Sequence, residues 1–354
     1  MKIAITADVH LTNREKHPER FHAFENILDQ LVEKDIHILI VAGDLFDVTC
    51  DTPGDLEYII KKDKYSKIEI IIIPGNHDPM ISPGTFSLSN IQYLTTPRQI
   101  QWDDSMPFFF VPYKAGKSMG EILVENTAGL EPEAWVLVGH GDWLSGTSLK
   151  NNYEDGMYMP LSRRDLLLYK PLKVFLGHIH AKMDSANVHY PGSPCALDPT
   201  EIGYRSFLVF DTKNRRVTRE NIETDFLFFD EQITVLPLDD EESYIRNLLT
   251  SKMREWNIPQ NHVSKVRIRI KVRGYSKDRQ KLAWVIRDCL KDYQFADANQ
   301  PDLSQLKVST DLMQQTIAKL VKQKIDDLEL NPKPGEADRD EILLAALNII
   351  YGGK

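Results

Sequence analysis

One segment sets the architecture of this chain: His37-Ile38-Leu39-Ile40-Val41-Ala42-Gly43-Asp44-Leu45-Phe46-Asp47. Its run of aliphatic and β-branched residues ends abruptly at Gly43-Asp44, and buried parallel strands have continuous apolar runs of this kind. In open α/β folds, ligands bind just outside the carboxyl ends of such strands. We therefore expect Asp44 to lie where a carboxylate can bind or react.

Four further apolar runs end in polar side chains in the same manner. These runs cover residues 1–7, 68–74, 134–138 and 172–176. The polar side chains that follow them are Asp8 and His10, Asn76, His140, and His178 and His180. The repetition predicts one cluster of polar side chains at the carboxyl ends of several strands.

Composition places the chain among globular proteins. Its 354 residues are enough for two or three domains. Of these residues, 42% are hydrophobic and 27% are charged, which is typical of a globular protein. No apolar run approaches the roughly 18 residues that cross a bilayer. Cys50, Cys195 and Cys289 form no CxxC pair, so a reducing cytoplasmic setting is expected. The net charge of −9 argues against a nucleic-acid partner when taken alone, although a local basic excess matters more than the sum.

The order of the other elements predicts a mixed α/β (α+β) chain. Amphipathic helices are expected at residues 18–34 and 54–64, so the first half consists of β-α-β units with parallel strands. A loop-rich region at 79–131 contains short strands at 98–102 and 108–113, and residues 144–160 are expected to form a loop. Closing strands are expected at 188–190 and 206–211.

The last third of the chain has a different pattern. Strands at 232–237 and 264–273, alternating with helices at 240–255 and 276–292, predict a small α/β cap domain. Two helices within 308–351 predict a C-terminal helical hairpin, because the prolines of Asn331-Pro332-Lys333-Pro334-Gly335 cannot continue a helix. We therefore expect domains at residues 1–215, 216–298 and 299–354.

The polar cluster has the composition of a metal site. Oxygen and nitrogen donors of this kind suit manganese, iron or zinc, and we favour manganese. Two ions need a shared carboxylate, for which Asp44 is the candidate; two-metal sites hold ions about 3.5–4 Å apart and clamp a phosphate. A single Asp or His of this kind is more often a turn former or a structural residue. The interpretation therefore rests on the whole set: Asp8, His10, Asp44, Asn76, His140, His178 and His180.

In chain order, five motifs resemble those of the calcineurin-like metallophosphoesterases: Asp8-x-His10, Gly43-Asp44-x-x-Asp47, Gly75-Asn76-His77-Asp78, Gly139-His140 and Gly177-His178-x-His180. The resemblance implies a four-layer β-sandwich flanked by helices, with a di-metal site at the strand ends. It implies that His77 protonates the leaving oxygen or stabilises developing charge, and that Asp47 orients His77. The implied ligands are Asp8, His10, Asp44 and His180 for one ion and Asp44, Asn76, His140 and His178 for the other.

Two further features resemble the SbcD-type DNA nucleases of this superfamily. The loop Tyr190-Pro191-Gly192-Ser193-Pro194 matches that branch, and Ser193 suits contact with a DNA phosphate; an ordinary turn is the alternative. SbcD-type proteins have a DNA-binding cap where this chain has its basic strand. The alternative interpretation of this strand is an edge strand whose lysines and arginines prevent aggregation. Period 2 places these cations of the strand on one face: Lys265, Arg267, Arg269, Lys271 and Arg273.

The C-terminal hairpin carries an apolar stripe. SbcD-type nucleases end in a helix-loop-helix that binds the coiled-coil base of an SbcC-type, SMC-like ATPase, and helix-in-groove association uses such stripes. The alternative is a helix docked on its own core. The resemblance also implies a homodimer and a cytoplasmic, nucleoid-associated protein with no membrane contact. The stripe consists of Ile317, Leu320, Val321, Ile325 and Leu328.

Together these features predict a manganese-dependent DNA exonuclease or endonuclease that processes DNA ends in double-strand-break repair or recombination. A phosphatase or a cyclic-nucleotide phosphodiesterase is an alternative with the same di-metal site, but a small substrate has no use for a basic strand. A mainly structural, ATPase-tethering subunit is the second alternative. The complete ligand set argues against it.

Overall fold

The computed structural model describes residues 1–48, 53–102, 105–127, 129–144, 156–332 and 336–352. Residues 145–155 of the expected loop, residues 333–335 of the expected break and Cys50 lie outside the described residues. The chain forms two compact units. The first comprises Met1–Leu197 and Tyr204–Asp225, and the second comprises Asp198–Gly203 and Phe226–Lys354.

Two six-stranded sheets form the centre of the first unit. In the first sheet the strand order is β14-β13-β1-β2-β3-β4, and β1 to β4 are parallel neighbours. The long apolar runs of the sequence form its inner strands, as expected for a sheet covered on both faces. The bounds are β1 (Lys2–Thr6), β2 (Ile38–Ala42), β3 (Glu69–Ile73), β4 (Ile91–Tyr93), β13 (Ser206–Asp211) and β14 (Arg216–Asn221).

The second sheet has the order β11-β12-β10-β7-β6-β5, in which β6, β7, β10 and β12 are parallel. A small parallel pair, β8 (Trp143–Leu144) with β9 (Leu161–Ser162), follows β7 in the sequence. The bounds are β5 (Arg98–Ile100), β6 (Phe108–Val111), β7 (Val136–His140), β10 (Lys173–Gly177), β11 (Met183–Ser185) and β12 (Val188–Tyr190).

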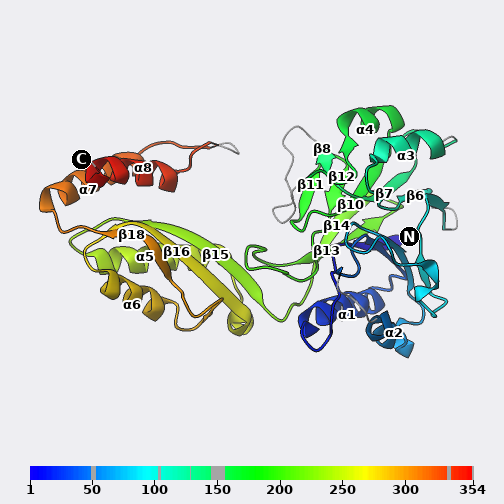
Figure 1. Cartoon of the computed structure of the whole chain (residues 1–354), viewed down its shortest axis with the longest axis horizontal. Coiled ribbons are helices and arrows are strands. Elements are labelled where there is room, and N and C mark those ends of the chain that lie inside the picture. The colour runs from blue at the N-terminus through cyan, green and yellow to red at the C-terminus, as the bar shows by residue number, and fades with distance from the viewer. Residues whose placement is uncertain (49–52, 103–104, 128, 145–155, 333–335, 353–354) are drawn as a thin grey trace. The chain divides into compact units, whose positions relative to one another are not determined.

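Helices cover the outer faces of the two sheets. Figure 1 shows α1 and α2 on one side of the first unit and α3 and α4 on the other. The core between the sheets consists of inward-facing side chains from both, so the expected four-layer β-sandwich is confirmed. The helix bounds are α1 (Pro18–Glu33), α2 (Pro53–Ile60), α3 (Met119–Asn126) and α4 (Arg163–Tyr169), with short 3₁₀ turns at Asp63–Tyr65 and Pro83–Thr85.

Several elements of this unit were not predicted from the sequence, among them the short strands β4, β8, β9 and β11. Helix α3 lies in the region expected to be loop-rich, and α4 and β14 were not expected. Both helices are short, and each begins with a capping box, formed by Ser118 with Glu121 and by Ser162 with Asp165. A capping box satisfies the first N–H groups of a helix, so these residues were the available sequence signal.

The second unit is a parallel sheet with helices. Its inner strand β16 pairs with β15 on one side and with β17 and β18 on the other. Strand β15 begins at Leu227 rather than at residue 232, because its first residues pair with the start of β16. The bounds are β15 (Leu227–Val235), α5 (Glu241–Trp256), a 3₁₀ turn (Gln260–Lys265), β16 (Val266–Ser276), α6 (Arg279–Cys289), β17 (Gln294–Phe295) and β18 (Asp302–Val308).

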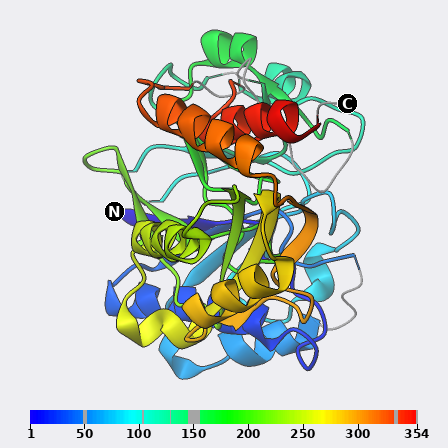
Figure 2. The same ribbon diagram turned by 90° about the vertical axis from the view of Figure 1, so that its left-hand side faces the viewer.

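The expected C-terminal hairpin consists of α7 (Leu312–Asp326) and α8 (Arg339–Gly352). The two helices lie side by side (Figure 2). Leu343 and Leu347 of α8 pack with Ile325 of α7 against Leu236 and Tyr275 of the sheet region. The hairpin is therefore docked on the second unit. Within the described residues, no helix has the length and apolar character that crossing a bilayer requires.

Candidate metal centre

The seven predicted donors lie at the carboxyl ends of five strands. Strands β1, β2 and β3 are parallel neighbours in one sheet, and β7 and β10 are parallel neighbours in the other. Because parallel strands end at the same edge of a sheet, the two sheets present their donors together. Asp8 and His10 follow β1, Asp44 follows β2, Asn76 follows β3, His140 ends β7, and His178 and His180 follow β10.

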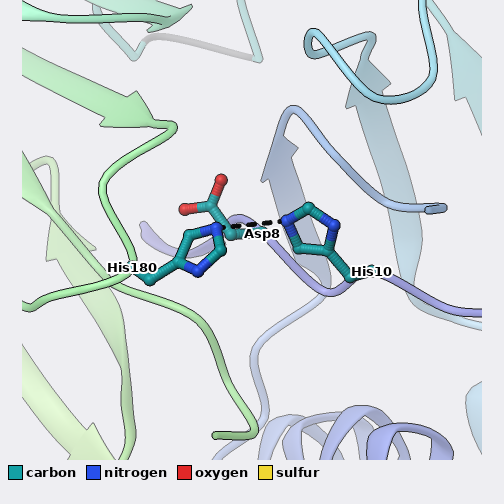
Figure 3. Close-up of side chains that lie close together, drawn as sticks. All are labelled: Asp8, His10 and His180. Atoms are coloured by element: carbon teal, nitrogen blue, oxygen red, sulfur yellow. Dashed lines mark hydrogen bonds between the residues drawn. The ribbon is translucent and has the colours of Figure 1, made fainter. Parts of the chain in front are cut away.

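One group of donors consists of Asp8, His10 and His180 (Figure 3). The Nε2 atoms of His10 and His180 are 3.2 Å apart. One ligand atom from each of the three residues lies within 4.8 Å of the other two. Asp8 and His10 are buried. The three donors thus converge on one point, as ligands of a single ion do.

The second group surrounds Asn76. Its Oδ1 lies 2.9 Å from Nε2 of His140 and 3.1 Å from Nδ1 of His178. The Nδ1–H of His140 donates to the Ala42 carbonyl over 2.9 Å. Because a carbonyl oxygen can only accept, this bond places a proton on Nδ1 and directs Nε2 into the site.

Asp44 lies between the two groups. Its Oδ2 is 3.7 Å from Nε2 of His10 and 3.3 Å from Nε2 of His140. Its Oδ1 accepts the backbone N–H of His77 over 2.8 Å. Oδ2 of Asp44 therefore faces one histidine of each group. This is the position that a carboxylate shared by two ions requires.

Four of the donors have a left-handed backbone. The φ angles are +53° at Asp8, +50° at His10, +51° at Asp44 and +97° at His178, a region that residues with a Cβ rarely adopt. Residues held in such conformations cluster at functional sites, because the surrounding structure must hold them there. The backbone strain is thus located in the turns that direct these donor side chains into the site.

Two glycines permit the close approach of these turns. A Cβ on Gly75 would lie 2.1 Å from Oδ1 of Asp44. A Cβ on Gly177 would lie 2.1 Å from the carbonyl oxygen of Ala42 and 2.7 Å from Nδ1 of His140. The glycines that precede the donors in the sequence are therefore required by the space between facing loops.

Burial and neighbouring charge shift the pKa values of the donors in opposite directions. Burial raises the pKa of Asp8 to about 6 and lowers the pKa of His10 to about 3. Burial alone would raise the pKa of Asp44, but His140 and His10 outweigh it and hold this pKa below its usual range. Burial alone would lower the pKa of His140, but Asp44 outweighs it and raises this pKa to about 9. The site thus holds protons that a cation can replace.

These residues fit bound divalent ions. Oδ2 of Asp8 is buried and has no hydrogen-bond partner among the described residues, which is costly unless an ion or a water binds it. Three overlapping donor groups share residues: Asp8, His10 and His180; His10, Asp44 and His77; and Asp8, Asp44 and His140. Mixed oxygen and imidazole donors suit manganese, iron or zinc.

His77 and Asp47 lie at the open side of the site. Nδ1 of His77 is 3.2 Å from Oδ1 of Asp47, and this hydrogen bond lowers the pKa of Asp47 below its usual range. The His77 ring packs edge-on against His10, with ring centroids 4.6 Å apart. The His77 side chain keeps 25% of its exposure, so it is accessible where the buried donors are not.

Sequence reasoning missed two buried charged residues that support the site. The carboxylate of Asp78 accepts the N–H of Gly75 over 2.7 Å and the N–H of Phe46 over 3.2 Å, which ties together the loops after β3 and β2. Arg20 of α1 donates to the carbonyl of His10. The sequence signal for Asp78 was its place three residues after a turn glycine, and Arg20 gave no local signal.

Comparison with known families matches residues 1–201 to the family named Calcineurin-like phosphoesterase. The match covers more than half of the chain and all seven donors. The chain belongs to the calcineurin-like phosphoesterases. This family hydrolyses phosphoesters at a di-metal site, and the converging donors of this phosphoesterase supply the residues for one.

Two curated relatives match this phosphoesterase at low identity. A protein named "Probable cyclic nucleotide phosphodiesterase" from Fibrobacter succinogenes is 24% identical over an alignment of length 214, and the match covers 56% of this chain and 82% of that protein. The DNA double-strand break repair protein Mre11 from Saccharolobus solfataricus is 26% identical over an alignment of length 230, and the match covers 58% of each chain. The chain thus aligns with little more than half the length of Mre11.

Two solved structures align with this phosphoesterase at low similarity. An archaeal phosphodiesterase has 15% sequence identity and a TM-score of 0.35, covering 62% of this chain and 99% of its own. The Plasmodium protein GAP50, described as an anchor in the inner membrane complex, has 10% identity and a TM-score of 0.39, covering 63% of this chain and 89% of its own.

Ser193 of this phosphoesterase lies buried beside a predicted metal donor. Its side chain is buried, its hydroxyl accepts from Arg205, and its backbone N–H donates to the carbonyl of His180 over 3.1 Å. Arg205 also donates to that His180 carbonyl. The loop around Ser193 therefore supports a metal donor instead of facing solvent.

The basic strand is an inner strand, so the edge-strand alternative is wrong. Its β-branched residues are buried and its cations lie on the other face, as period 2 predicts. Lys265 is the exception, because it ends the 3₁₀ turn before β16. Arg269 pairs with Asp230 of β15, and Lys271 lies 4.0 Å from the same carboxylate.

The apolar stripe of α7 is divided between two faces. Ile325 is buried in the core beneath the hairpin, and Val321 packs against that core. In contrast, Ile317, Leu320 and Leu328 are 43%, 55% and 46% exposed. The docked-helix alternative thus accounts for part of the stripe, and the rest faces outward.

Proposed function

We propose that this phosphoesterase is a manganese-dependent DNA phosphodiesterase that processes DNA ends. The observation that carries the proposal is the cation-bearing face of β16. On it Arg267, Arg269, Lys271 and Arg273 stand at alternate positions, and Asp230 is the carboxylate that β15 pairs with them. A local cationic excess on a sheet face suits a phosphate backbone.

The lengths of the relatives also support a nucleic-acid substrate. The phosphodiesterase from Fibrobacter is aligned over 82% of its length, which leaves little of it to match the second unit of this chain. Mre11 is aligned over 58% of its length and of this chain, so both proteins continue far beyond the shared domain. In this chain that additional part contains the cation-bearing strand β16, to which the proposal assigns the binding of a long substrate.

The chain's own residues define the chemistry. The proposed ligands are Asp8, His10, Asp44 and His180 for one ion and Asp44, Asn76, His140 and His178 for the other. When bound, the two ions supply Lewis acidity and lower the pKa of water. Asp47 holds Nδ1 of His77, and Nε2 of that ring is the proposed donor of a proton to the leaving oxygen.

The catalytic proposal is tested with end-labelled linear DNA, with 3′,5′-cyclic AMP and with para-nitrophenyl phosphate, each in the presence of manganese. We expect DNA cleavage by the wild type and its loss in His77→Ser, while manganese still binds the variant. His37→Ser, which alters a histidine with 53% side-chain exposure outside the site, is the matched control. Turnover of cyclic AMP or of the monoester without DNA cleavage would refute the nuclease assignment.

A second test addresses the cationic face. Lys271→Glu reverses an exposed cation of β16, and Lys291→Glu reverses an exposed cation elsewhere in the same unit. We expect the first variant to bind DNA more weakly and with a smaller salt dependence, and the second to bind like the wild type. Hydrolysis of a small phosphodiester should be equal in both. Equal DNA binding by the two variants would contradict the proposal.

The outward face of α7 is proposed to bind an SbcC-type, SMC-like ATPase at its coiled-coil base. Met313 extends the exposed side of the stripe, with 77% exposure. Such a contiguous apolar helix face suits helix-in-groove binding. We expect Leu320→Glu to abolish co-elution with the coiled-coil fragment and Lys319→Glu, on another side of α7, to retain it. Retention by both variants would exclude this surface.

A homodimer that acts on nucleoid DNA in the cytoplasm completes the proposal. Sedimentation equilibrium gives the oligomeric state directly, and a monomer at micromolar concentration would refute the dimer. The cyclic-nucleotide phosphodiesterase function is the second candidate, favoured by the relative from Fibrobacter. The substrate comparison above decides between the two.

A further inference from the structure

Arg20 occupies a position that is unfavourable for an arginine. It is the third residue of α1 and is 9% exposed. A cation in the first turn opposes the helix dipole, and burying a charged side chain costs free energy unless partners compensate. The formation of α1 does not explain Arg20, so its contacts must.

Arg20 contacts the backbone of a metal donor. Its Nη1 donates to the carbonyl oxygen of His10 over 2.5 Å. The N–H of His10 donates to the carbonyl of Asp44 over 3.0 Å. His10 has a left-handed backbone, so its peptide groups are turned out of the β1 ladder and need these two partners. Arg20 thus holds one side of the turn that aims the His10 ring.

The same nitrogen of Arg20 faces the partner of the proposed acid. Nη1 lies 3.6 Å from Oδ2 of Asp47, while the other carboxylate oxygen, Oδ1, lies 3.2 Å from Nδ1 of His77. Guanidinium, carboxylate and imidazole therefore form a connected row. One end of the row is fixed to the His10 backbone and the other end is the His77 ring.

We propose that Arg20 is a positioning residue that sets the placement of His77 relative to the ion held by His10. Hydrolysis needs the attacking and the leaving oxygens at opposite ends of the phosphorus, so the metal site and the acid must keep a fixed separation. The edge-on packing of the His10 and His77 rings shows how closely the two are matched. The proposal deepens the proposed function, because it rests on the role assigned to His77.

The test uses the full-length protein and two small diesters, methyl para-nitrophenyl phosphate and methyl phenyl phosphate. The phenyl ester has the poorer leaving group and needs the proton more. We expect Arg20→Met to lower kcat about 10–100-fold on the phenyl ester, since a misplacement near 1 Å can cost about 10²-fold. On the para-nitrophenyl ester we expect a much smaller loss. His77→Ser should show the same selectivity.

A second readout is independent of turnover. Titration of manganese into metal-stripped Arg20→Met should give a several-fold weaker Kd than the wild type, because the His10 turn is released. Arg20→Lys should recover part of both effects, since an ammonium group reaches one partner and lacks the planar fork. Arg14→Met is the control, because Arg14 is a half-buried arginine that stacks at 5.9 Å over Phe21 of α1, the helix that carries Arg20.

Equal losses on both esters, with manganese affinity unchanged, would overturn the proposal, because they would show a merely structural role. If Arg20→Met does not fold, Arg20→Lys decides: selective loss on the phenyl ester supports the proposal, and uniform kinetics refute it. If His77→Ser itself shows no leaving-group selectivity, the assigned role of His77 fails. The manganese titration then still judges the contact of Arg20 with His10.

Discussion

Replacing Asp78 with asparagine should remove a pH-dependent destabilisation of the metal-free protein and yet impair catalysis. Asp78 is 4% exposed, and burial raises the pKa of its carboxyl to about 6 from the ordinary 3.8. Its two oxygens accept from Gly75 and Phe46, one in each of two loops that carry metal donors. The charge therefore destabilises the fold while the carboxylate holds the site together.

The magnitude follows from linkage. Because the folded pKa of Asp78 exceeds its unfolded value, stability falls as pH rises from about 4 through 6. The full effect is about 3 kcal/mol, at about 1.4 kcal/mol per tenfold change in proton affinity. The asparagine side chain has no charge to bury, so the unfolding free energy of Asp78→Asn relative to the wild type should rise by about 2–3 kcal/mol between pH 4 and pH 8.

The functional cost has a separate origin. An asparagine side chain has one acceptor oxygen, so the N–H of either Gly75 or Phe46 loses its partner. The loop that carries Asn76 and His77 is then tied by one bond instead of two, and kcat should fall about 10–100-fold, as for other groups that orient metal ligands. From pH 4 to pH 8 the variant should therefore gain stability relative to the wild type, while its activity at pH 8 is lower.

Urea unfolding in EDTA at pH 4 and pH 8, followed by circular dichroism, measures the first effect, and hydrolysis of a small phosphodiester with manganese measures the second. Asp278→Asn is the matched control, because Asp278 also accepts two backbone N–H groups but is exposed at the start of α6. Asparagine caps helices as well as aspartate, so neither quantity should change. A pH-independent difference for Asp78→Asn, or full activity, would refute the reasoning.

Three further predictions concern the metal donors. Asp44→Asn should reduce bound manganese to less than two ions per chain and lower kcat by at least about 10²–10³-fold; two ions by atomic absorption would contradict the bridge. Gly177→Ala should weaken manganese binding about 10–100-fold, because its Cβ meets the Ala42 carbonyl at 2.1 Å; calorimetry measures it. Manganese affinity should rise from pH 7 to 9, because the pKa of His140 is raised to about 9 and binding displaces that proton; equal affinity at both pH values would contradict this.

Local patterns were sufficient to locate the metal donors from the sequence. Each donor lies at or just after the end of a strand-like segment, and the carboxyl ends of parallel strands meet at one edge, so the donors of one sheet could be brought together without knowing the strand order. The meeting of Asp44 and His140, which belong to different sheets, follows from the packing of the two sheets. The short helices α3 and α4 were missed because they leave no such local pattern. With 8 and 7 residues, they are too short for a helical period to stand out.

The charge of β16 could not be predicted correctly from such local patterns. From the strand alone, every cation of the basic face counted as available to a phosphate. In the sheet, Arg269 is hydrogen bonded to Asp230, a residue 39 positions earlier that becomes its neighbour through parallel pairing with β15. Charge patterning on one strand therefore overestimates the free charge of a face, because the adjacent strand of a parallel sheet comes from a distant part of the chain.

Local sequence patterns identify the residues that bind metal or react, but they do not identify the residues that position them. A donor must be at a strand end, and a glycine must precede it where two loops touch, so the chemistry leaves a local trace. Arg20 and Asp78 act across the site on loops that come from other strands, and any partner with the right reach would satisfy those loops. Their supporting roles follow from tertiary contacts alone. For this phosphoesterase, the variants that report on Arg20 and Asp78 therefore test the structure, whereas variants of the seven donors test mainly the sequence pattern.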